Sequence, residues 1–226
     1  MTSLSIARAV VATAGCLFPA GLRAADRSPQ DDARITLRQT VDCWVETDLY
    51  FHRGEGVRAL IGQSPTKTPS NWASVDTRVT LMRCLGSRTT KGETYVAELR
   101  FTPILLRGAA FRALYLQQFG SKKLPPLKPI VVDPPWRVES SDGFSLLQQF
   151  GECVVAGDPV NAHAILFESV ASDREKKAYA ALASALSKCV AGGSTIKFSK
   201  TLIEGVVAEG LYHLAGGDIH MRKAKQ

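Results

Sequence analysis

The sequence predicts an all-α fold of two tandem, pseudo-symmetric helical repeats with about four helices each and one disulfide per repeat. Three observations predict it: apolar residues recur at helical spacing, three sequence anchors occur twice in the same order, and four cysteines follow an N-terminal signal. A proline-rich connector separates the repeats. The prediction also allows a small amount of short β-strand. The chain thus divides into a signal peptide (1–24), a first repeat (25–120), a linker (121–137) and a second repeat (138–226).

The first 24 residues have the pattern of a secretory signal peptide. An early arginine precedes an apolar stretch over residues 9–22, and small residues follow at Ala24 and Ala25. Cleavage after Ala24 or after Ala25 fits this pattern, and a lipoprotein signal processed at Cys16 is the alternative. The broken stretch is short of the roughly 20 apolar residues that a membrane-spanning helix needs. We therefore expect a periplasmic or secreted protein whose mature chain has no transmembrane segment.

The charge of the chain disfavours nucleic acid as a partner. Loss of the signal peptide lowers Lys+Arg from 28 to 26, against 21 Asp+Glu. The remaining cations form no dense stripe interleaved with aromatic residues, which a nucleic-acid-binding face requires.

The two halves of the mature chain match at three anchors. The sequence VDCWVETD around Cys43 resembles GECVVAGD around Cys153, and LMRCLGS around Cys84 resembles LSKCVAG around Cys189. The segment LLRGAAFRALY is matched by LIEGVVAEGLY. The anchors lie 110, 105 and 97 residues apart. Their common order predicts an internal duplication with longer loops in the first copy.

Four cysteines in an exported chain indicate disulfides. Of the three possible pairings, Cys43–Cys84 with Cys153–Cys189 respects the repeat, because each unit then closes on itself. No CxxC motif and no histidine at ligand spacing is present, so no metal ligand is assigned.

Helix signals in the first repeat are uneven. The periodicity predicts helices over 35–47, 56–61, about 74–84 and 103–120, the last of them after the capping residue Thr102. The paired carboxylates Asp31 and Asp32 are expected in a solvated tail. The alternating segment TYVAELRF predicts a short extended piece, which could pair with STIKF of the second repeat.

Helix starts in the second repeat carry capping residues. They are Ser141 or Asp142, Asp158 before Pro159, and Ser172 with Glu175 in a capping box. The final helix is expected from about Lys200 to Leu214, with Gly216 and Gly217 ending it.

The matched closing segments describe a packing surface. Gly108 and Gly205 would cost stability inside a helix, so close approach of another backbone is expected there. Tyr115 and Tyr212 end the segments and should find a buried acceptor for the hydroxyl group. These four residues are therefore the predicted helix-packing positions.

The charges of these segments change sign between the copies. Arg107 and Arg112 of the first copy correspond to Glu204 and Glu209 of the second. They are either independent, solvated positions or partners across a pseudo-twofold axis, and the sequence leaves both readings open.

No catalytic constellation is recognised, and no catalytic or cofactor-binding residue is assigned. The HExxH, GxSxG and GxxxxGK[ST] motifs are absent from the sequence. His52 and His163 are placed at corresponding points of the second helices, as structural or solvated residues.

The anchors resemble uncharacterised, internally duplicated, signal-peptide-bearing exported proteins of alphaproteobacteria. The resemblance rests on Cys followed by two apolar residues and Asp-Pro, a second Cys that ends a helix, and Leu-x-Gly with a closing Leu-Tyr. It implies a Gram-negative envelope and supplies no activity. We expect a non-catalytic binding or structural role toward an unknown envelope protein or polymer. The alternative is a periplasmic hydrolase or an enzyme inhibitor that uses a groove between the repeats.

Overall fold

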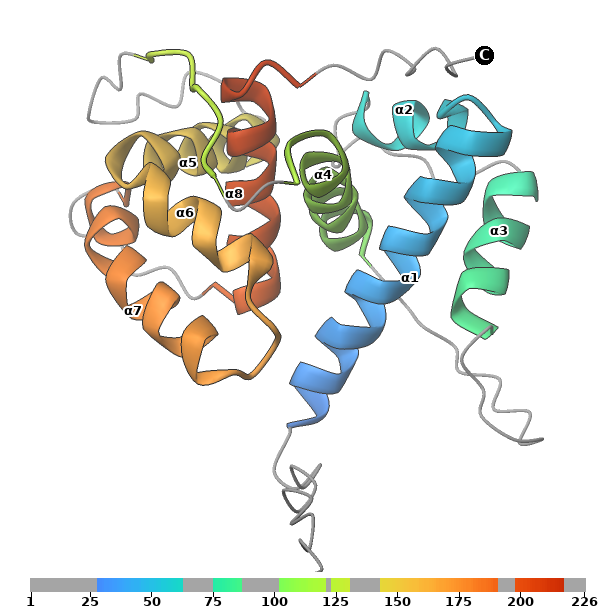
Figure 1. The fold of residues 1–226 in the computed structure, drawn as a ribbon, viewed down its shortest axis with the longest axis horizontal. Coiled ribbons are helices and arrows are strands. Elements are labelled where there is room, and N and C mark those ends of the chain that lie inside the picture. The colour runs from blue at the N-terminus through green and yellow to red at the C-terminus, as the bar shows by residue number, and fades with distance from the viewer. Residues whose placement is uncertain are drawn as a thin grey trace, which may run out of the picture.

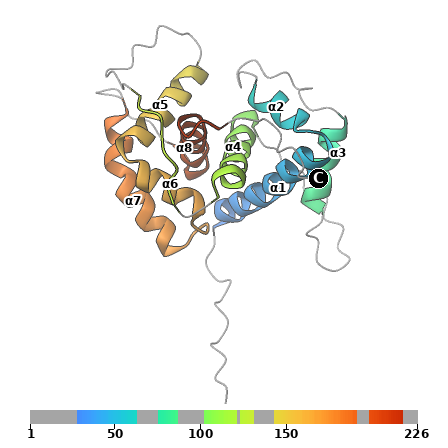
Figure 2. The ribbon, with the colours of Figure 1, turned by 45° about the horizontal axis from the view of Figure 1, so that its top comes forward.

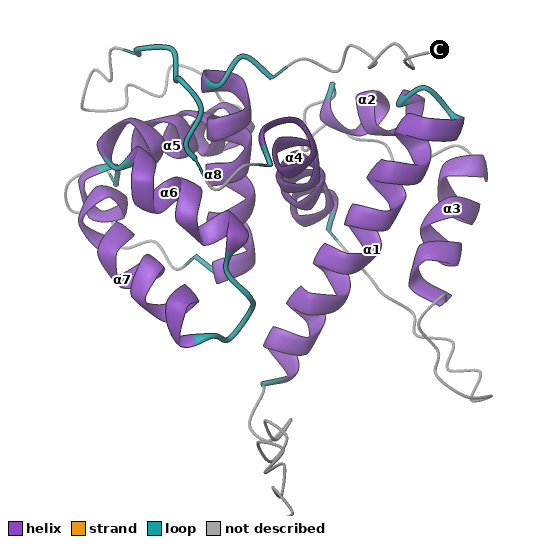
Figure 3. Cartoon of the chain, viewed as in Figure 1, coloured by secondary structure: helices purple, strands orange, loops and turns teal. Residues whose placement is uncertain are grey.

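The computed structural model describes residues 28–62, 75–86, 102–120, 123–130, 143–190 and 198–217, which form helices and short non-helical segments (Figure 3). The helices of these ranges are α1 (Pro29–Phe51), α2 (Glu55–Ile61), α3 (Val75–Gly86), α4 (Pro103–Phe119), α5 (Gly143–Gly157), α6 (Pro159–Phe167), α7 (Asp173–Lys188) and α8 (Lys200–Leu214). No strand occurs in the described ranges, so the prediction of an all-α fold is confirmed.

The helices form two halves, α1–α4 and α5–α8, which meet along α4 and α8. Figure 1 places α1–α3 on one side and α5–α7 on the other, with α4 and α8 between them, and Figure 2 shows the same order from a second direction. Helix α4 also packs on α1 and α2, and α8 also packs on α5 and α6. The two closing helices are therefore central and bury side chains on more than one face.

Helix α1 begins earlier than the sequence pattern indicates. Ser28 is its N-cap and accepts a hydrogen bond from the backbone N–H of Asp31 at 3.2 Å, with Pro29 in the first turn. Asp31 and Asp32 lie in the first turn of α1 and not in a tail, although Asp32 is exposed to solvent and Asp31 is partly exposed. Carboxylates there interact favourably with the helix dipole. The hydrogen bond from the Ser28 hydroxyl lowers the pKa of Asp31.

The two matched aspartates both accept hydrogen bonds from the first turn of the following helix, Asp158 as the N-cap of α6 and Asp48 from within α1. The Asp48 carboxylate accepts from the backbone N–H of Val57 at 3.0 Å, and Asp158 accepts from that of Asn161 at 3.1 Å. The second helices thus start from the same kind of contact in both halves. His52 does not lie in a second helix as expected, because it is the C-cap of α1.

The capping box of α7 forms with one difference. The Ser172 hydroxyl accepts from the N–H of Glu175 at 3.1 Å, as expected. The Glu175 carboxylate, however, accepts from the N–H of Ala171 at 3.0 Å, one residue before the N-cap. Helix α8 has the expected bounds.

Both predicted disulfides are confirmed. Cys43–Cys84 joins α1 to α3, and Cys153–Cys189 joins α5 to the end of α7. Each bridge therefore closes within one half. The duplication itself stays a prediction.

Several predictions fall outside the described residues: the signal peptide, the N-cap at Ser141 or Asp142, and the extended piece at 94–101. The extended piece was expected to pair with residues 194–198. Of these residues the structure describes only Phe198, which is in no strand. The described part of the connector, residues 123–130, is non-helical, and the N–H of Lys128 donates to the carbonyl of Leu214 at 2.7 Å. Among the described helices, none is long and apolar enough to cross a bilayer.

Candidate functional site

The interface between the halves is built around two glycines. A Cβ atom at Gly108 would lie 2.5 Å from the Cα of Gly205, and one at Gly205 would lie 2.8 Å from the Cα of Gly108. No side chain fits between the helices at this point. The matched glycines thus bring the α4 and α8 backbones into direct contact, which is the close approach expected from the sequence.

The charges that change sign between the copies pair across this crossing. Arg107 lies 2.7 Å from Glu209, and Arg112 lies 3.0 Å from Glu204. All four residues are at most 8% exposed, so the reading of independent solvated positions is wrong and the expected ion pairs are present, while the pseudo-twofold axis stays a prediction. Arg107 also donates to the carbonyl of Leu60 at 3.3 Å, which ties the end of α2 to the interface.

Glu204 is the centre of a buried ion-pair cluster. Arg38 donates to both of its carboxylate oxygens, with distances of 2.7 Å from Nε and from Nη2. Arg34 donates to the same carboxylate at 3.2 Å, and Arg112 completes the set. One carboxylate of α8 therefore pairs with guanidinium groups from both α1 and α4.

Glu175 of α7 is the second anion of this cluster. Its side chain is fully buried and accepts from Arg34 at 2.6 Å, and Lys200 lies 3.8 Å away. Because its carboxylate also accepts from the Ala171 N–H, Glu175 links the start of α7 to α1. An isolated buried carboxylate would be very costly, so these contacts make its burial possible.

Charge is segregated across the interface. In the ion pairs between the halves, among described residues, the cations come from α1 and α4 and the carboxylates from α7 and α8. Asp42 adds a carboxylate from the first half, 3.1 Å from Arg112. Burial raises the pKa of Asp42, although Arg112 opposes the shift. Segregated charge makes the first half complementary to the second and repulsive toward a copy of itself.

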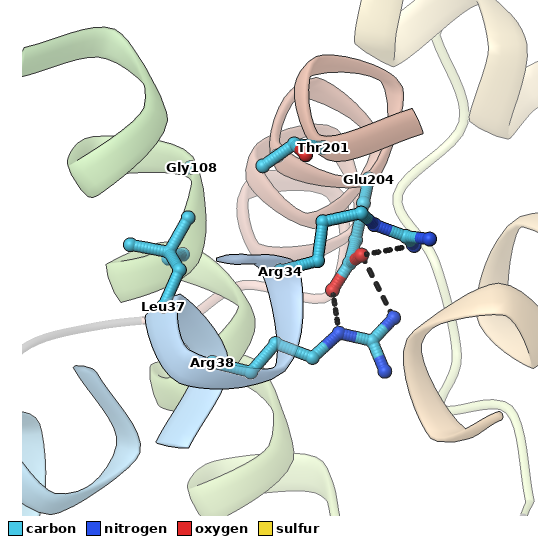
Figure 4. A pocket seen from close by; sticks show the side chains of 8 residues that line it. Arg34, Leu37, Arg38, Gly108, Thr201 and Glu204 are labelled. Atoms are coloured by element: carbon cyan, nitrogen blue, oxygen red, sulfur yellow. Dashed lines mark hydrogen bonds and ion pairs between the residues drawn. The ribbon is translucent and has the colours of Figure 1, made fainter. Parts of the chain in front are cut away.

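A small hollow adjoins the cluster (Figure 4). It has a volume of about 10 Å³ and lies between Arg34, Arg38, Gly108, Thr201 and Glu204. That volume is roughly the room that one water molecule needs. The hollow therefore cannot take an organic substrate, and its carboxylate is already paired.

The matched tyrosines are buried beside the interface. The Tyr115 hydroxyl lies 2.7 Å from Nδ1 of His163, so α4 is tied to α6, and burial raises the Tyr115 pKa. The Tyr212 ring packs 5.5 Å from the ring of Phe111. His163 is thus a structural residue of the interface.

A half-exposed polar trio lies on α5 and α8. Nδ1 of His213 lies 3.7 Å from Oε1 of Glu152, and the amide nitrogen of Gln148 lies 3.2 Å from that oxygen and 3.3 Å from Nδ1. The contact with His213 lowers the pKa of Glu152. In the described ranges, no group of three or more His, Cys, Asp or Glu side chains is arranged for a metal ion.

Sequence reasoning found the glycines, the tyrosines and the cysteines but missed most of the cluster. Arg34 and Arg38 were not singled out, and Glu175 was assigned only to the capping box of α7. The available signal was the spacing of Arg34 and Arg38, four apart on the same face as Leu37 of α1. Their partners lie 141 to 170 residues away, and no local pattern points to them.

The fold and the interface define an all-α protein of two disulfide-closed halves joined by a buried, charge-complementary contact. No protein-family model, no curated protein and no solved structure matches the chain.

Proposed function

We propose that the protein is an exported, non-catalytic component of a Gram-negative cell envelope, with a binding or structural role toward an envelope protein or polymer. The observation that carries this proposal is the chemistry of the interface. The buried carboxylates of Glu175 and Glu204 form ion pairs with arginines of the same chain, and the hollow beside them has room for about one water molecule. Buried ionic groups arranged in this way position the two halves, whereas a catalytic group must reach a substrate.

Two further observations support export. Both disulfides close within a half and are of the structural kind found in oxidising compartments. The N-terminal sequence has the pattern of a secretory signal. An export assay would test this directly: residues 1–24 fused to a phosphatase that is active only outside the cytoplasm should give activity, and a fusion lacking them should not.

The binding role is tested by site-specific crosslinking in intact envelopes. A photoreactive residue would replace Phe51, which is 69% exposed on the first half, or Val160, which is 65% exposed on the second. A specific adduct from one position and none from the other is the expected result, and it would identify the partner and the half that binds it.

The same preparations distinguish the competing function. The purified mature chain is incubated with envelope polymers, and released fragments are measured. Turnover of a polymer without any crosslinked partner would overturn the proposal in favour of the hydrolase. Inhibition of an envelope enzyme by the bound protein would favour the inhibitor.

A further inference from the structure

Gln148, Glu152 and His213 form a polar cluster on α5 and α8 that takes no part in the ion pairs between the halves. His213 Nδ1 and Glu152 Oε1 both lie beside the amide nitrogen of Gln148, at 3.3 Å and 3.2 Å from it, respectively. The Gln148 amide thus fills a position between two electron-pair donors. An imidazole nitrogen and a carboxylate oxygen are ligands that transition metals prefer.

The separation of the two donors suits a metal ion. They lie 3.7 Å apart. An ion bonded to both at about 2.1 Å would have a ligand–metal–ligand angle of about 120°, near that of a tetrahedral or trigonal site. Rotation of the Gln148 amide would present its oxygen as a third, weaker ligand.

The two helices that carry the donors are held rigidly. A Cβ at Gly151 would overlap the carbonyl oxygen of Val206, and one at Gly210 would lie 2.8 Å from the carbonyl carbon of Gly151. The α5 and α8 backbones therefore touch directly beside Glu152 and one turn before His213. The His213 ring also packs edge-on against Phe111 at 5.3 Å. Ligands on rigid, closely packed elements lose little freedom on binding an ion.

The site is partly open. The side chains of His213 and Glu152 are 34% and 26% exposed, so an ion can enter and keep water in its remaining positions. Imidazole with few oxygen ligands disfavours Ca²⁺ and Mg²⁺, which require more oxygen donors.

We propose that Glu152 and His213, with Gln148 as a third ligand, form a binding site for one divalent transition-metal ion such as Zn²⁺ or Cu²⁺. The site lies on the second half, outside the buried ion pairs, and does not depend on the proposed envelope partner. Cu²⁺ should bind more tightly than Zn²⁺, following the general order for nitrogen and oxygen ligands.

Calorimetric titration of the tag-free mature chain, with its disulfides intact, tests the site. Zn²⁺ and Cu²⁺ should each bind with one-to-one stoichiometry, and Mg²⁺ should not bind. His213→Ala and Glu152→Gln should each weaken Zn²⁺ binding by at least about tenfold. Gln148→Glu should tighten it by about tenfold, because a carboxylate replaces the neutral amide. His52→Gln is the matched control and should leave the affinity unchanged.

The variants separate a metal site from a structural polar contact. Gln148→Glu would add repulsion beside Glu152 if the trio had only a structural role, so tighter binding by this variant is diagnostic. Absence of saturable Zn²⁺ and Cu²⁺ binding overturns the proposal. Retention of full affinity by His213→Ala, or weaker binding by Gln148→Glu, overturns it as well. The envelope crosslinking result is unaffected by any of these outcomes.

Discussion

Gly108 and Gly205 show how one residue type sets the distance between the two halves. Any side chain at either position meets backbone atoms of the facing helix, which cannot rotate away as a flexible side chain could. The ion pairs of Arg107 and Arg112 depend on this spacing, because they flank the crossing on both sides.

Gly108→Ala should therefore lower the free energy of unfolding by about 1–3 kcal/mol or more, the usual cost of overpacking. Denaturant unfolding of the oxidised chain measures this loss. Gly86→Ala is the control, since a Cβ there meets nothing within 4 Å, and it should be neutral or slightly stabilising. Equal stability of the two variants would show that α4 and α8 do not touch at Gly108.

Glu204 makes a second prediction at this scale. Glu204→Ala leaves Arg34, Arg38 and Arg112 buried without their shared anion, which should cost about 3–5 kcal/mol in the free energy of unfolding. Thermal and urea unfolding report the loss. The exposed pair of Asp173 with Lys176 is the comparison, because solvent screens this pair and Asp173→Asn should leave the stability nearly unchanged. Similar losses in both variants would mean that the cluster does not stabilise the fold.

The role of a single residue could be predicted from the sequence only where neighbouring residues in the chain indicated that role. The glycines and tyrosines could be found because they occupy matched positions in two copies of one segment. Arg34 could not, because its role depends on Glu175 and Glu204, which lie in the other half of the chain. A buried cation is unusual, and hydrophobic periodicity treats every arginine as exposed.

Individual helices were predicted best where a cap and an apolar stripe agreed. Helix α8 has both a serine cap and a continuous apolar face, and its bounds were as expected. The apolar pattern misses the start of α1 because its first turns carry polar residues, of which Arg34 is buried and Gln30 and Asp32 are exposed. The apolar pattern begins only at Ile35, although the Ser28-Pro29 cap starts the helix.

Asp48 connects two elements, and this gives a prediction at the scale of the helix. Its buried carboxylate accepts from the N–H groups of Gly56 and Val57, the first turn of α2. Asp48→Ala should cost about 1–2 kcal/mol in the free energy of unfolding, because these donors lose their acceptor. Asp48→Asn retains an oxygen acceptor and should recover part of the loss. Hydrogen exchange should show faster exchange in α2 of the alanine variant, and unchanged exchange there would refute the capping role.

At the scale of the whole molecule, two kinds of bond have separate tasks. The disulfides act within the halves, and the segregated ion pairs act between them. Sequence anchors predicted the first, because the cysteines belong to the matched segments. The ion pairs between the halves form only when α1, α4, α7 and α8 come together. The sequence therefore predicted the glycine contact between α4 and α8, and it left open whether the charges that change sign form pairs.

This division predicts how removal of each disulfide affects the chain. The bridges enclose 41 and 36 residues, so the chain-entropy model gives each about 4 kcal/mol as an upper value. One variant carries alanine at both Cys43 and Cys84, and the other carries alanine at both Cys153 and Cys189. Each should therefore lower the free energy of unfolding by a similar amount, about 2–4 kcal/mol. Urea unfolding compares the two variants. Peptide mapping without reductant is the control on the native chain, and a bridge between Cys43 and Cys153 would contradict the closed halves. A much larger loss from one pair would show that its bridge also supports the contact between halves, since loop length alone makes the two bridges nearly equal.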